Sequence, residues 1–220
     1  GIPRDLYVSL PATSSNEEKQ KTKFSYLSLY GGAKSLIQGA EELLDTKIDY
    51  YIQLDMSGFQ KLIDAIGGVD VIADRSFKTD WKTSFQKGIN HVNGKEALTF
   101  VRERHHHLRG TEQRNKNHQQ MLKAILKKVM KKNLLEMDIN ALYKLCKKNV
   151  RTDMKTGEIL SLMRWQKEEK VEWEMETASI KGKFALETLA EYPDAKLYVE
   201  KVDQKSLDQV SKKIKKMLKT

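Results

Sequence analysis

Arginine is concentrated in residues 101–121, the part of this sequence best suited to binding a charged ligand. This stretch contains four arginines: Arg102, Arg104, Arg109 and Arg114. A guanidinium group binds phosphate oxygens in pairs and keeps its charge when it is partly desolvated. Four such groups beside an apolar run predict a site for a multiply charged oxyanion. The alternative is a solvated basic loop, which the charge alone favours because most charge runs are solvated.

A helix is expected directly after these arginines, over residues 112–130, with Thr111 as its N-cap. Arg114 and His118 share one stripe of this helix with apolar residues at helical spacing: Met121, Leu122, Ile125, Leu126, Val129 and Met130. The stripe runs from cationic to apolar, so it would fit a ligand with a phosphate head and a hydrocarbon tail. The alternative is a core-facing helix whose first turns carry an arginine.

The elements before this helix must bring two of the arginines together. Arg102 and Arg104 lie two residues apart, so their side chains point the same way only where the chain is extended. Asn93-Gly94 predicts a turn, and residues 94–101 predict a short helix. We expect this helix to end near Val101, which would allow both guanidinium groups to converge.

Regular elements alternate along the rest of the chain. Strands are expected at residues 6–10, 50–54, 69–72, 171–177 and 197–199. Further helices are expected at residues 24–30, 33–44, 57–66 with Ser57 as N-cap, 139–150, 157–165 and 206–218. Residues 77–87 fit a loop or an edge hairpin. This order predicts a mixed α/β fold in a single domain, with a central, mostly mixed β-sheet flanked by helices on both faces and no internal boundary.

Composition limits the partners without choosing one. The 220 residues are 39% hydrophobic, which is enough for one well-packed domain. Forty Lys and Arg against thirty Asp and Glu give a net charge of +10, which favours nucleic acid, a lipid headgroup or an acidic glycopolymer. The single cysteine, Cys146, excludes an intrachain disulfide and is expected to be a buried thiol. The sequence contains no membrane-spanning segment.

Short motifs in a fixed order give the sequence a specific likeness to a known family. They are Ile2-Pro3-Arg4-Asp5, Lys23 ahead of Tyr30-Gly31-Gly32, Ile48-Asp49-Tyr50-Tyr51, Gly67-Gly68-Val69-Asp70-Val71, the run from Gly88 to Ala97, Val101-Arg102-Glu103-Arg104, and Arg114 followed by Gln119-Gln120. Together they resemble the extracytoplasmic catalytic domain of the LytR-CpsA-Psr family over nearly the whole chain. Each motif alone is weak, whereas their order and separation are specific.

This resemblance implies an enzyme of Gram-positive envelope assembly. Such enzymes move a wall teichoic acid or capsular polymer from an undecaprenyl pyrophosphate carrier to peptidoglycan, forming a phosphodiester. The implied partners are therefore the lipid-linked glycopolymer, the peptidoglycan acceptor and the membrane surface, with no nucleic acid. The implied location is the extracytoplasmic face of the cell membrane, with an N-terminal transmembrane anchor outside this chain.

The resemblance also implies which residues bind the carrier. Pyrophosphate ligands carried over by position are Arg4, Lys23, Arg102, Arg104, Arg114 and Gln119. In the family the polyprenyl tail lies in an apolar tunnel, and the groove residues expected here are Met121, Leu122 and Ile125. The resemblance leaves the catalytic base unassigned.

The sequence departs from the family pattern in ways that bear on the metal and on phosphate contact. Mg²⁺ is the expected cofactor, but its two aspartate ligands precede the Ile2-Pro3-Arg4-Asp5 motif in the family. We therefore expect a fragment that lacks the first strands and holds no metal site of its own, and whose activity depends on the missing part. His118 stands where the family usually has Gln, Thr111 where it has an acidic residue, and Ser25 where it has Asn.

Other polar residues fit structural roles better than catalytic ones. His105, His106 and His107 are adjacent, so they cannot all face one ion, and a solvated loop is expected. Asp5 beside Arg4 is more simply an ion-pair partner than a base. Asp55 and Asp70 are expected to end strands or cap turns. Trp81, Trp165 and Trp173 lack the interleaved basic residues of a single-stranded nucleic-acid platform.

Two further classes of function stay open at this point. A DNA-binding transcriptional regulator or attenuator would explain the net charge of +10, although no compact helix-turn-helix is evident. A non-catalytic module that binds polyprenyl phosphate would keep the arginines and the groove without turnover. A sequence-selective shift of duplex DNA would favour the first class, and binding without glycan transfer would favour the second.

Overall fold

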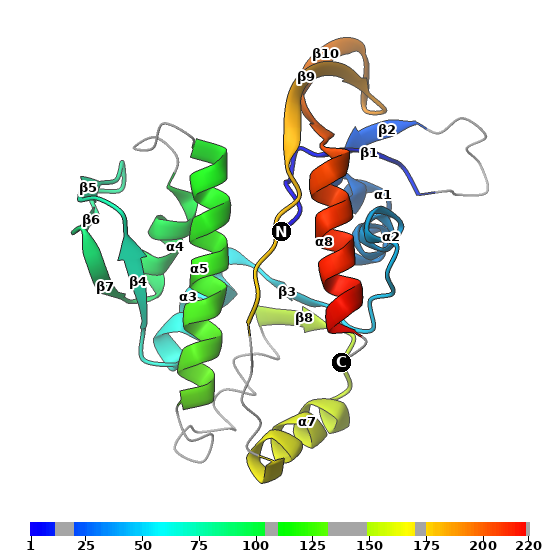
Figure 1. The fold of residues 1–220 in the computed structure, drawn as a ribbon. Coiled ribbons are helices and arrows are strands. Elements are labelled where there is room, and N and C mark those ends of the chain that lie inside the picture. The colour runs from blue at the N-terminus through cyan, green and yellow to red at the C-terminus, as the bar shows by residue number, and fades with distance from the viewer. Residues whose placement is uncertain (12–19, 104–109, 132–148, 170–174, 219–220) are drawn as a thin grey trace. The chain divides into compact units, whose positions relative to one another are not determined.

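The computed structural model describes residues 1–11, 20–103, 110–131, 149–169 and 175–218 (Figure 1). The chain divides into two compact units. The terminal unit comprises Gly1–Asp49 and Thr177–Thr220, and the central unit comprises Tyr50–Glu176. Arg104, Arg109, the three adjacent histidines, Cys146 and Trp173 lie outside the described residues, as do the greater part of the helix expected at 139–150 and of the strand expected at 171–177.

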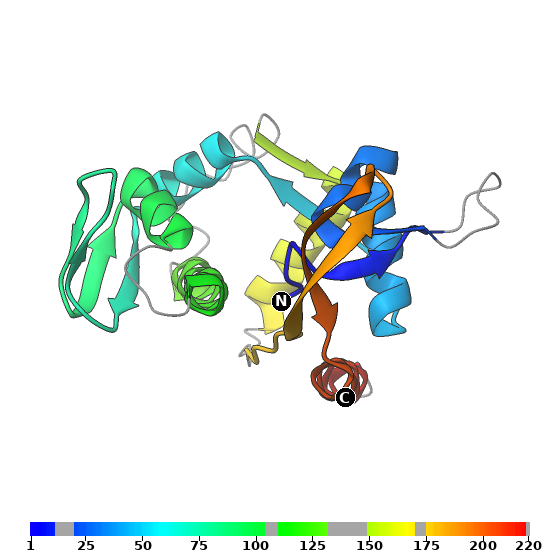
Figure 2. The ribbon, with the colours of Figure 1, turned by 90° about the horizontal axis from the view of Figure 1, so that it is seen from above.

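The terminal unit consists of two strand pairs and a set of helices. Strand β1 (Tyr7–Ser9) pairs antiparallel with β2 (Lys21–Lys23), and β9 (Gly182–Leu189) pairs antiparallel with β10 (Tyr192–Val202). A parallel bridge between Leu6 and Glu200 joins the start of β1 to β10. The helices are η1 (Phe24–Leu27), α1 (Ser28–Gly31), α2 (Ala33–Leu44) and α8 (Gln204–Met217). Figure 2 shows the same elements from above.

A small apolar core holds the terminal unit together. Leu6 and Ile180 are almost completely buried, and Leu207 and Val210 of α8 pack with them. Helix α8 begins where the side chain of Asp203 accepts a hydrogen bond from the backbone N–H of Ser206 at 2.9 Å. This cap satisfies one of the free N–H groups of the first turn and fixes the start of the helix.

The central unit contains the larger core. Its elements in chain order are β3 (Ile52–Leu54), α3 (Met56–Ala65), β4 (Val69–Ala73), β5 (Phe77–Lys78), β6 (Ser84–Phe85), β7 (Gly88–Val92), α4 (Gly94–Arg102), α5 (Gly110–Lys131), β8 (Val150–Thr152) and α7 (Thr156–Glu169). Alternate residues of β4 are buried, so one face of the β4–β7 pair meets the helices. Helix α5 packs along α4 and β4 (Figure 1) and contributes Met121, which is 2% exposed, to the core.

The mixed α/β class expected from the sequence is confirmed. Within the described residues, however, the strands form five two-stranded antiparallel sheets and not the single central sheet that was expected. Several strands are only two or three residues long, which limits how many neighbours they can pair with. The single-domain organisation over all 220 residues stays a prediction.

The N-caps of two helices differ from the sequence-based expectations. Helix α5 begins at Gly110, so Thr111 lies inside the helix and is not its N-cap. Helix α3 is capped by Asp55, which accepts from the N–H of Gly58 at 2.6 Å, and Ser57 lies within the helix. Helix α4 begins at Gly94, as expected, and the sequence analysis did not foresee that Asn93 is its N-cap and forms a reciprocal capping box with Glu96.

Most other elements lie close to the expected positions. Helix α2 spans residues 33–44 as predicted, and α4 ends at Arg102, one residue beyond the expected end. Residues 77–87 form the edge hairpin that was one of the two expectations, with Phe77 opposite Phe85. Strands β2, β7, β8 and β9 were not expected, and Val150, the last residue of the helix expected at 139–150, is the first residue of β8. Strands β7 and β9 alternate weakly because exposed positions are apolar, including Ile89 and Phe184, whereas β2 consists only of the polar residues Lys21–Lys23.

Candidate functional site

The first group of predicted site residues lies in the terminal unit, where the turn before β1 meets the end of β2. The N–H of Phe24 donates to the carbonyl of Leu6 at 2.8 Å, and the N–H of Ser25 donates to the carbonyl of Arg4 at 2.9 Å. These bonds extend the β1–β2 pairing and hold Arg4 beside the start of η1. We call Arg4, Asp5 and Lys23 the terminal cluster.

Asp5 is the centre of the terminal cluster. Its carboxylate lies 3.1 Å from Lys23 Nζ and 3.8 Å from Arg4 Nε. The side chains of Lys23 and Asp5 are only 13% and 19% exposed, whereas Arg4 is 55% exposed. The structure therefore brings Arg4 and Lys23 together, as predicted, and it gives Asp5 the ion-pair role expected from the sequence.

Two aromatic rings complete the surroundings of Lys23. Its ammonium group lies 5.8 Å from the ring centre of Tyr26 and 5.7 Å from that of Tyr198. Such cation–π contacts help to offset the loss of hydration of a partly buried ammonium group. Lys23 is thus held on one side by a carboxylate and on others by π faces, which makes it a fixed positive charge with little freedom to follow a ligand.

A hydrogen-bonded carboxylate in the same unit fixes the Tyr30-Gly31-Gly32 motif. Thr22 Oγ1 lies 2.8 and 2.7 Å from the two oxygens of Glu191, and the Tyr30 hydroxyl donates to Glu191 Oε1 at 2.8 Å. Burial, this hydrogen bond and the charge of Glu191 together raise the pKa of Tyr30 to about 12. The motif thus ties α1 to the turn between β9 and β10, and the role it shows is structural.

The second group of predicted site residues lies in the central unit, at the end of α4. Arg102 is the last residue of α4, and its side chain is exposed. The guanidinium carbon lies 4.9 Å from the ring centre of Trp81, and Nη1 lies 3.9 Å from the sulfur of Met56. Sequence reasoning missed both contacts, because neither residue lies near Arg102 in the chain.

Helix α5 is bonded to the last turn of α4, just before Arg102. Asn117 Nδ2 donates to the carbonyl of Phe100 at 3.1 Å, and His118 Nε2 lies 3.0 Å from the carbonyl of Val101. Both contacts satisfy carbonyl groups that the end of a helix leaves free. His118 therefore holds two helices together, which explains a polar residue on the stripe between Arg114 and Met121.

Arg114 is the predicted site residue with the clearest unmet bonding capacity. It lies on α5 one turn before His118 and is half-buried. Its Nε atom is buried and has no hydrogen-bond partner among the described residues. A buried guanidinium N–H without an acceptor is costly, so an anionic ligand that supplied the acceptor would be favoured. We call Arg102 and Arg114 the central cluster.

The two neighbouring glutamines of α5 occupy different environments. Gln120 makes two hydrogen bonds to Ile72 of β4: its Oε1 accepts from the N–H at 2.7 Å and its Nε2 donates to the carbonyl at 3.2 Å. It therefore covers the free edge of β4 and is structural. Gln119 is half-buried, and its role as a phosphate ligand stays a prediction.

The apolar stripe of α5 is divided between the core and solvent. Met121 is 2% exposed and belongs to the core, Ile125 packs against that core, and Leu122 is 56% exposed. Adjacent helix positions point about 100° apart, which explains why Met121 and Leu122 differ. The lipid-tail groove stays a prediction, and of its three proposed residues Leu122 offers the most open surface.

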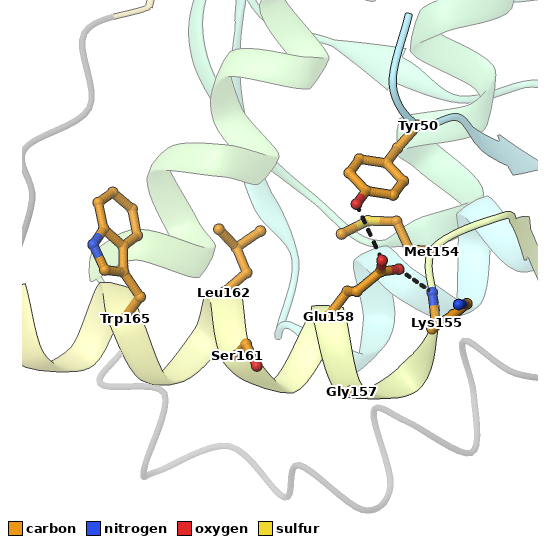
Figure 3. Close-up of a pocket in the computed structure, with 8 residues that line it drawn as sticks. All are labelled: Tyr50, Met154, Lys155, Gly157, Glu158, Ser161, Leu162 and Trp165. Atoms are coloured by element: carbon orange, nitrogen blue, oxygen red, sulfur yellow. Dashed lines mark hydrogen bonds between the residues drawn. The ribbon is translucent and has the colours of Figure 1, made fainter.

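A separate hollow of about 860 Å³ lies against α7 in the central unit (Figure 3). Tyr50, Met154, Leu162 and Trp165 give it a largely apolar lining. The Tyr50 hydroxyl donates to Glu158 Oε1 at 3.2 Å, while Glu158 Oε2 accepts from the N–H of Lys155 at 2.6 Å. Of the predicted site residues that the structure describes, none lines this hollow.

No candidate site for the expected Mg²⁺ ion is assigned among the described residues. Mg²⁺ prefers octahedral oxygen coordination that includes one or two carboxylates. Across the described ranges, no group of three or more His, Cys, Asp or Glu side chains is arranged to hold a metal ion. The carboxylate of the terminal cluster, Asp5, is already paired with Lys23. Mg²⁺ stays an expectation from the resemblance, and no step below depends on it.

The fold and these two clusters define a mixed α/β protein with cationic groups suited to a phosphate-bearing ligand. A family model described as the LytR_cpsA_psr family matches residues 1–216. The chain therefore belongs to the LytR-CpsA-Psr family. This confirms the resemblance carried by the short motifs, and the match extends over both units.

Similar proteins include a curated relative from Bacillus cereus named polyisoprenyl-teichoic acid–peptidoglycan teichoic acid transferase TagU. It is 37% identical over 127 residues, which are 58% of this chain and 40% of that protein. The chain thus matches well under half of that relative's length. A crystal structure of Bacillus subtilis TagV is 28% identical to this chain and superposes with a TM-score of 0.74. The match covers 99% of this chain and 82% of the TagV chain. A structure of TagT bound to LI-WTA is 23% identical and superposes with a TM-score of 0.73, which shows the shared fold. This match covers 100% of this chain and 78% of the TagT chain.

Proposed function

We propose that this protein transfers a glycopolymer of the teichoic acid or capsular type from an undecaprenyl pyrophosphate carrier to peptidoglycan, through a phosphodiester bond. Family membership and the name of the B. cereus relative support this proposal. The observation that carries it is the central cluster: Arg114 Nε is buried without an acceptor in the described part of the chain, and Arg102 ends the helix to which α5 is bonded.

The proposed reaction needs little more from the protein than position and charge. A hydroxyl oxygen of a peptidoglycan sugar attacks the phosphorus on the glycan side of the pyrophosphate and forms a new P–O bond. The bond from that phosphorus to the bridging oxygen breaks, and undecaprenyl phosphate leaves with its electron pair. The hydroxyl proton passes to solvent or to a base not assigned here. Cationic side chains would stabilise the charge that develops on the phosphoryl oxygens.

The residues of each cluster would contribute differently to this reaction. Arg102 and Arg114 offer planar N–H edges that suit paired phosphate oxygens. Arg4 is the exposed cation of the terminal cluster and could do the same, whereas Lys23 would contribute a fixed positive charge. The roles of Arg104 and Gln119 are carried over from the resemblance and stay predictions.

We propose that the protein acts at the extracytoplasmic side of the cell membrane, where lipid-linked glycopolymers and peptidoglycan meet. Of the helices that the structure describes, none combines the length and the apolar character that crossing a bilayer requires.

Calorimetric titration with farnesyl pyrophosphate, with and without Mg²⁺, tests the binding half of this proposal. Arg102→Ala and Arg114→Ala should each weaken binding at least tenfold, about 1.4 kcal/mol. Arg75→Ala is the matched control, because Arg75 is an exposed arginine of the same unit. Equal affinity in all four proteins would contradict the site.

A transfer assay with a lipid-linked teichoic acid precursor and peptidoglycan tests the second half. Transfer that is lost in Arg102→Ala but kept in Arg75→Ala supports the enzyme. Binding that depends on Arg102 without any transfer by the wild-type protein would instead identify a non-catalytic carrier-binding module.

A further inference from the structure

Trp81 is an exposed aromatic residue that lies against the cation of the central cluster. It is 47% exposed, and its ring centre lies 4.9 Å from the guanidinium carbon of Arg102. We propose that Trp81 is a positioning residue for phosphate binding: its ring fixes the plane of the Arg102 guanidinium and leaves the N–H edge free for the anion. The inference rests on the proposed function, since a phosphate group is the ligand it invokes.

The fold holds Trp81 in a hydrogen-bonded hairpin. Trp81 lies in the turn between β5 and β6, where the N–H of Thr79 donates to the carbonyl of Thr83 at 2.9 Å. The Thr79 hydroxyl also donates to that carbonyl, at 3.2 Å. The backbone of Lys82 has a φ of 61°, which tightens the turn directly after Trp81.

The same hairpin is fixed to the helix that carries Arg102. Phe85 of β6 is 2% exposed and stacks on Phe77 with ring centres 5.0 Å apart. It also contacts Phe100 of α4 at 5.3 Å. Because Phe100 lies two residues before Arg102, this aromatic contact fixes the distance between the hairpin and the end of α4. Trp81 and Arg102 are therefore presented by two elements that share one core.

Stacking has a chemical consequence for the guanidinium group. The guanidinium carbon lies over the Trp81 ring. In the parallel arrangement that this role requires, the ring covers one flat face of the group, while the N–H donors lie in the plane and point away from the ring. The neighbouring Met56 sulfur, 3.9 Å from Nη1, is a weak acceptor and does not neutralise the charge. Within the described residues no carboxylate pairs with Arg102, so its charge is available to a ligand.

A double-mutant cycle on farnesyl pyrophosphate affinity tests this role. Trp81→Ala should weaken binding about three- to fivefold in the wild-type background, the size of an exposed cation–π contact. It should have no effect in the Arg102→Ala background, because the contact that it removes is already absent. The same loss in both backgrounds would overturn the positioning role, since Trp81 would then act independently of Arg102.

Conservative and control variants separate this inference from the proposed function. Trp81→Phe keeps a π face and should restore most of the affinity, whereas Trp165→Ala removes an indole of similar exposure and should have no effect. A Trp81→Phe protein as weak as Trp81→Ala would overturn the stacking argument. If Arg102→Ala weakens binding and Trp81→Ala does not, only this inference fails. If Arg102→Ala itself has no effect, the proposed site fails and this inference with it.

Discussion

The two groups of cations in this protein bear the same kind of charge but differ in the groups that surround that charge. In the terminal cluster, Lys23 is mostly buried and bonded to the Asp5 carboxylate between two tyrosine rings. In the central cluster, Arg102 is exposed and its guanidinium carbon lies over the Trp81 ring, and Arg114 has a buried Nε without a partner among the described residues. The Lys23 charge is compensated inside the fold, whereas Arg102 and Arg114 have no carboxylate partner among the described residues.

This difference separates structure from binding. Removing one member of a partly buried ion pair leaves the other charge buried without a partner, so the cost appears in the free energy of unfolding. Removing an uncompensated charge costs the fold little, so the cost appears when an anion binds. The resemblance to the family assigns both groups the same role, and the structure gives each a different balance of the two effects.

The largest effect is expected on stability, in the terminal cluster. Asp5→Ala should lower the free energy of unfolding by about 2 kcal/mol, because Lys23 would keep its charge at 13% exposure without a carboxylate. Urea denaturation measures this change. Lys34→Ala, which removes an exposed lysine of α2 in the same unit, is the control and should stay within about 0.5 kcal/mol. Equal urea midpoints for Asp5→Ala and wild type would show that the ion pair does not stabilise the fold, which would contradict the proposed difference between the two clusters.

The next effect is on affinity, in the central cluster. Arg114→Ala should weaken farnesyl pyrophosphate binding at least tenfold, about 1.4 kcal/mol, while urea unfolding changes little because the buried Nε has no bond to lose. Calorimetry and denaturation on the same protein give both numbers. A large loss of stability with unchanged affinity would show that Arg114 stabilises the fold, as Lys23 does, and does not bind the ligand.

A smaller effect concerns the Tyr30–Glu191 bond of the terminal unit. The pKa of Tyr30 rises from 10.0 to about 12 on folding, so the folded state holds the proton more tightly. The stabilisation is complete below pH 10 and is lost as pH rises through 12. Solvent screening of the half-exposed ring limits it to about 1 kcal/mol. The difference in unfolding free energy between wild type and Tyr30→Phe should therefore shrink between pH 9 and 12, and a constant difference would exclude this linkage.

The smallest effect concerns the structural glutamine of the central unit. Gln120→Ala removes two hydrogen bonds to Ile72 at the edge of β4 and should cost about 1 kcal/mol or less, because Ile72 is itself 55% exposed and water can replace the amide. Hydrogen exchange at the Ile72 amide should become faster. Gln38→Ala on α2, which loses a contact to Glu42 in the other unit, should leave that exchange rate unchanged.

Local patterns in the sequence were sufficient for much of this description. Helix α2 and the body of α5 follow from apolar residues at helical spacing, and the short motifs identify the family. The basic residues of the two clusters were also found in the sequence, since arginine and lysine at these motif positions suit phosphate. These features depend on residues close together in the chain, which is why the sequence alone determines them.

The tertiary structure decided which charges are compensated and by what. The contacts of Lys23 with Asp5 and Tyr198, and of Arg102 with Trp81, join residues that are far apart in the chain. The same holds for the exact pairing of the strands and for the bond from His118 to α4. No local pattern encodes these partners, because which side chains meet depends on how separate elements pack on a shared core.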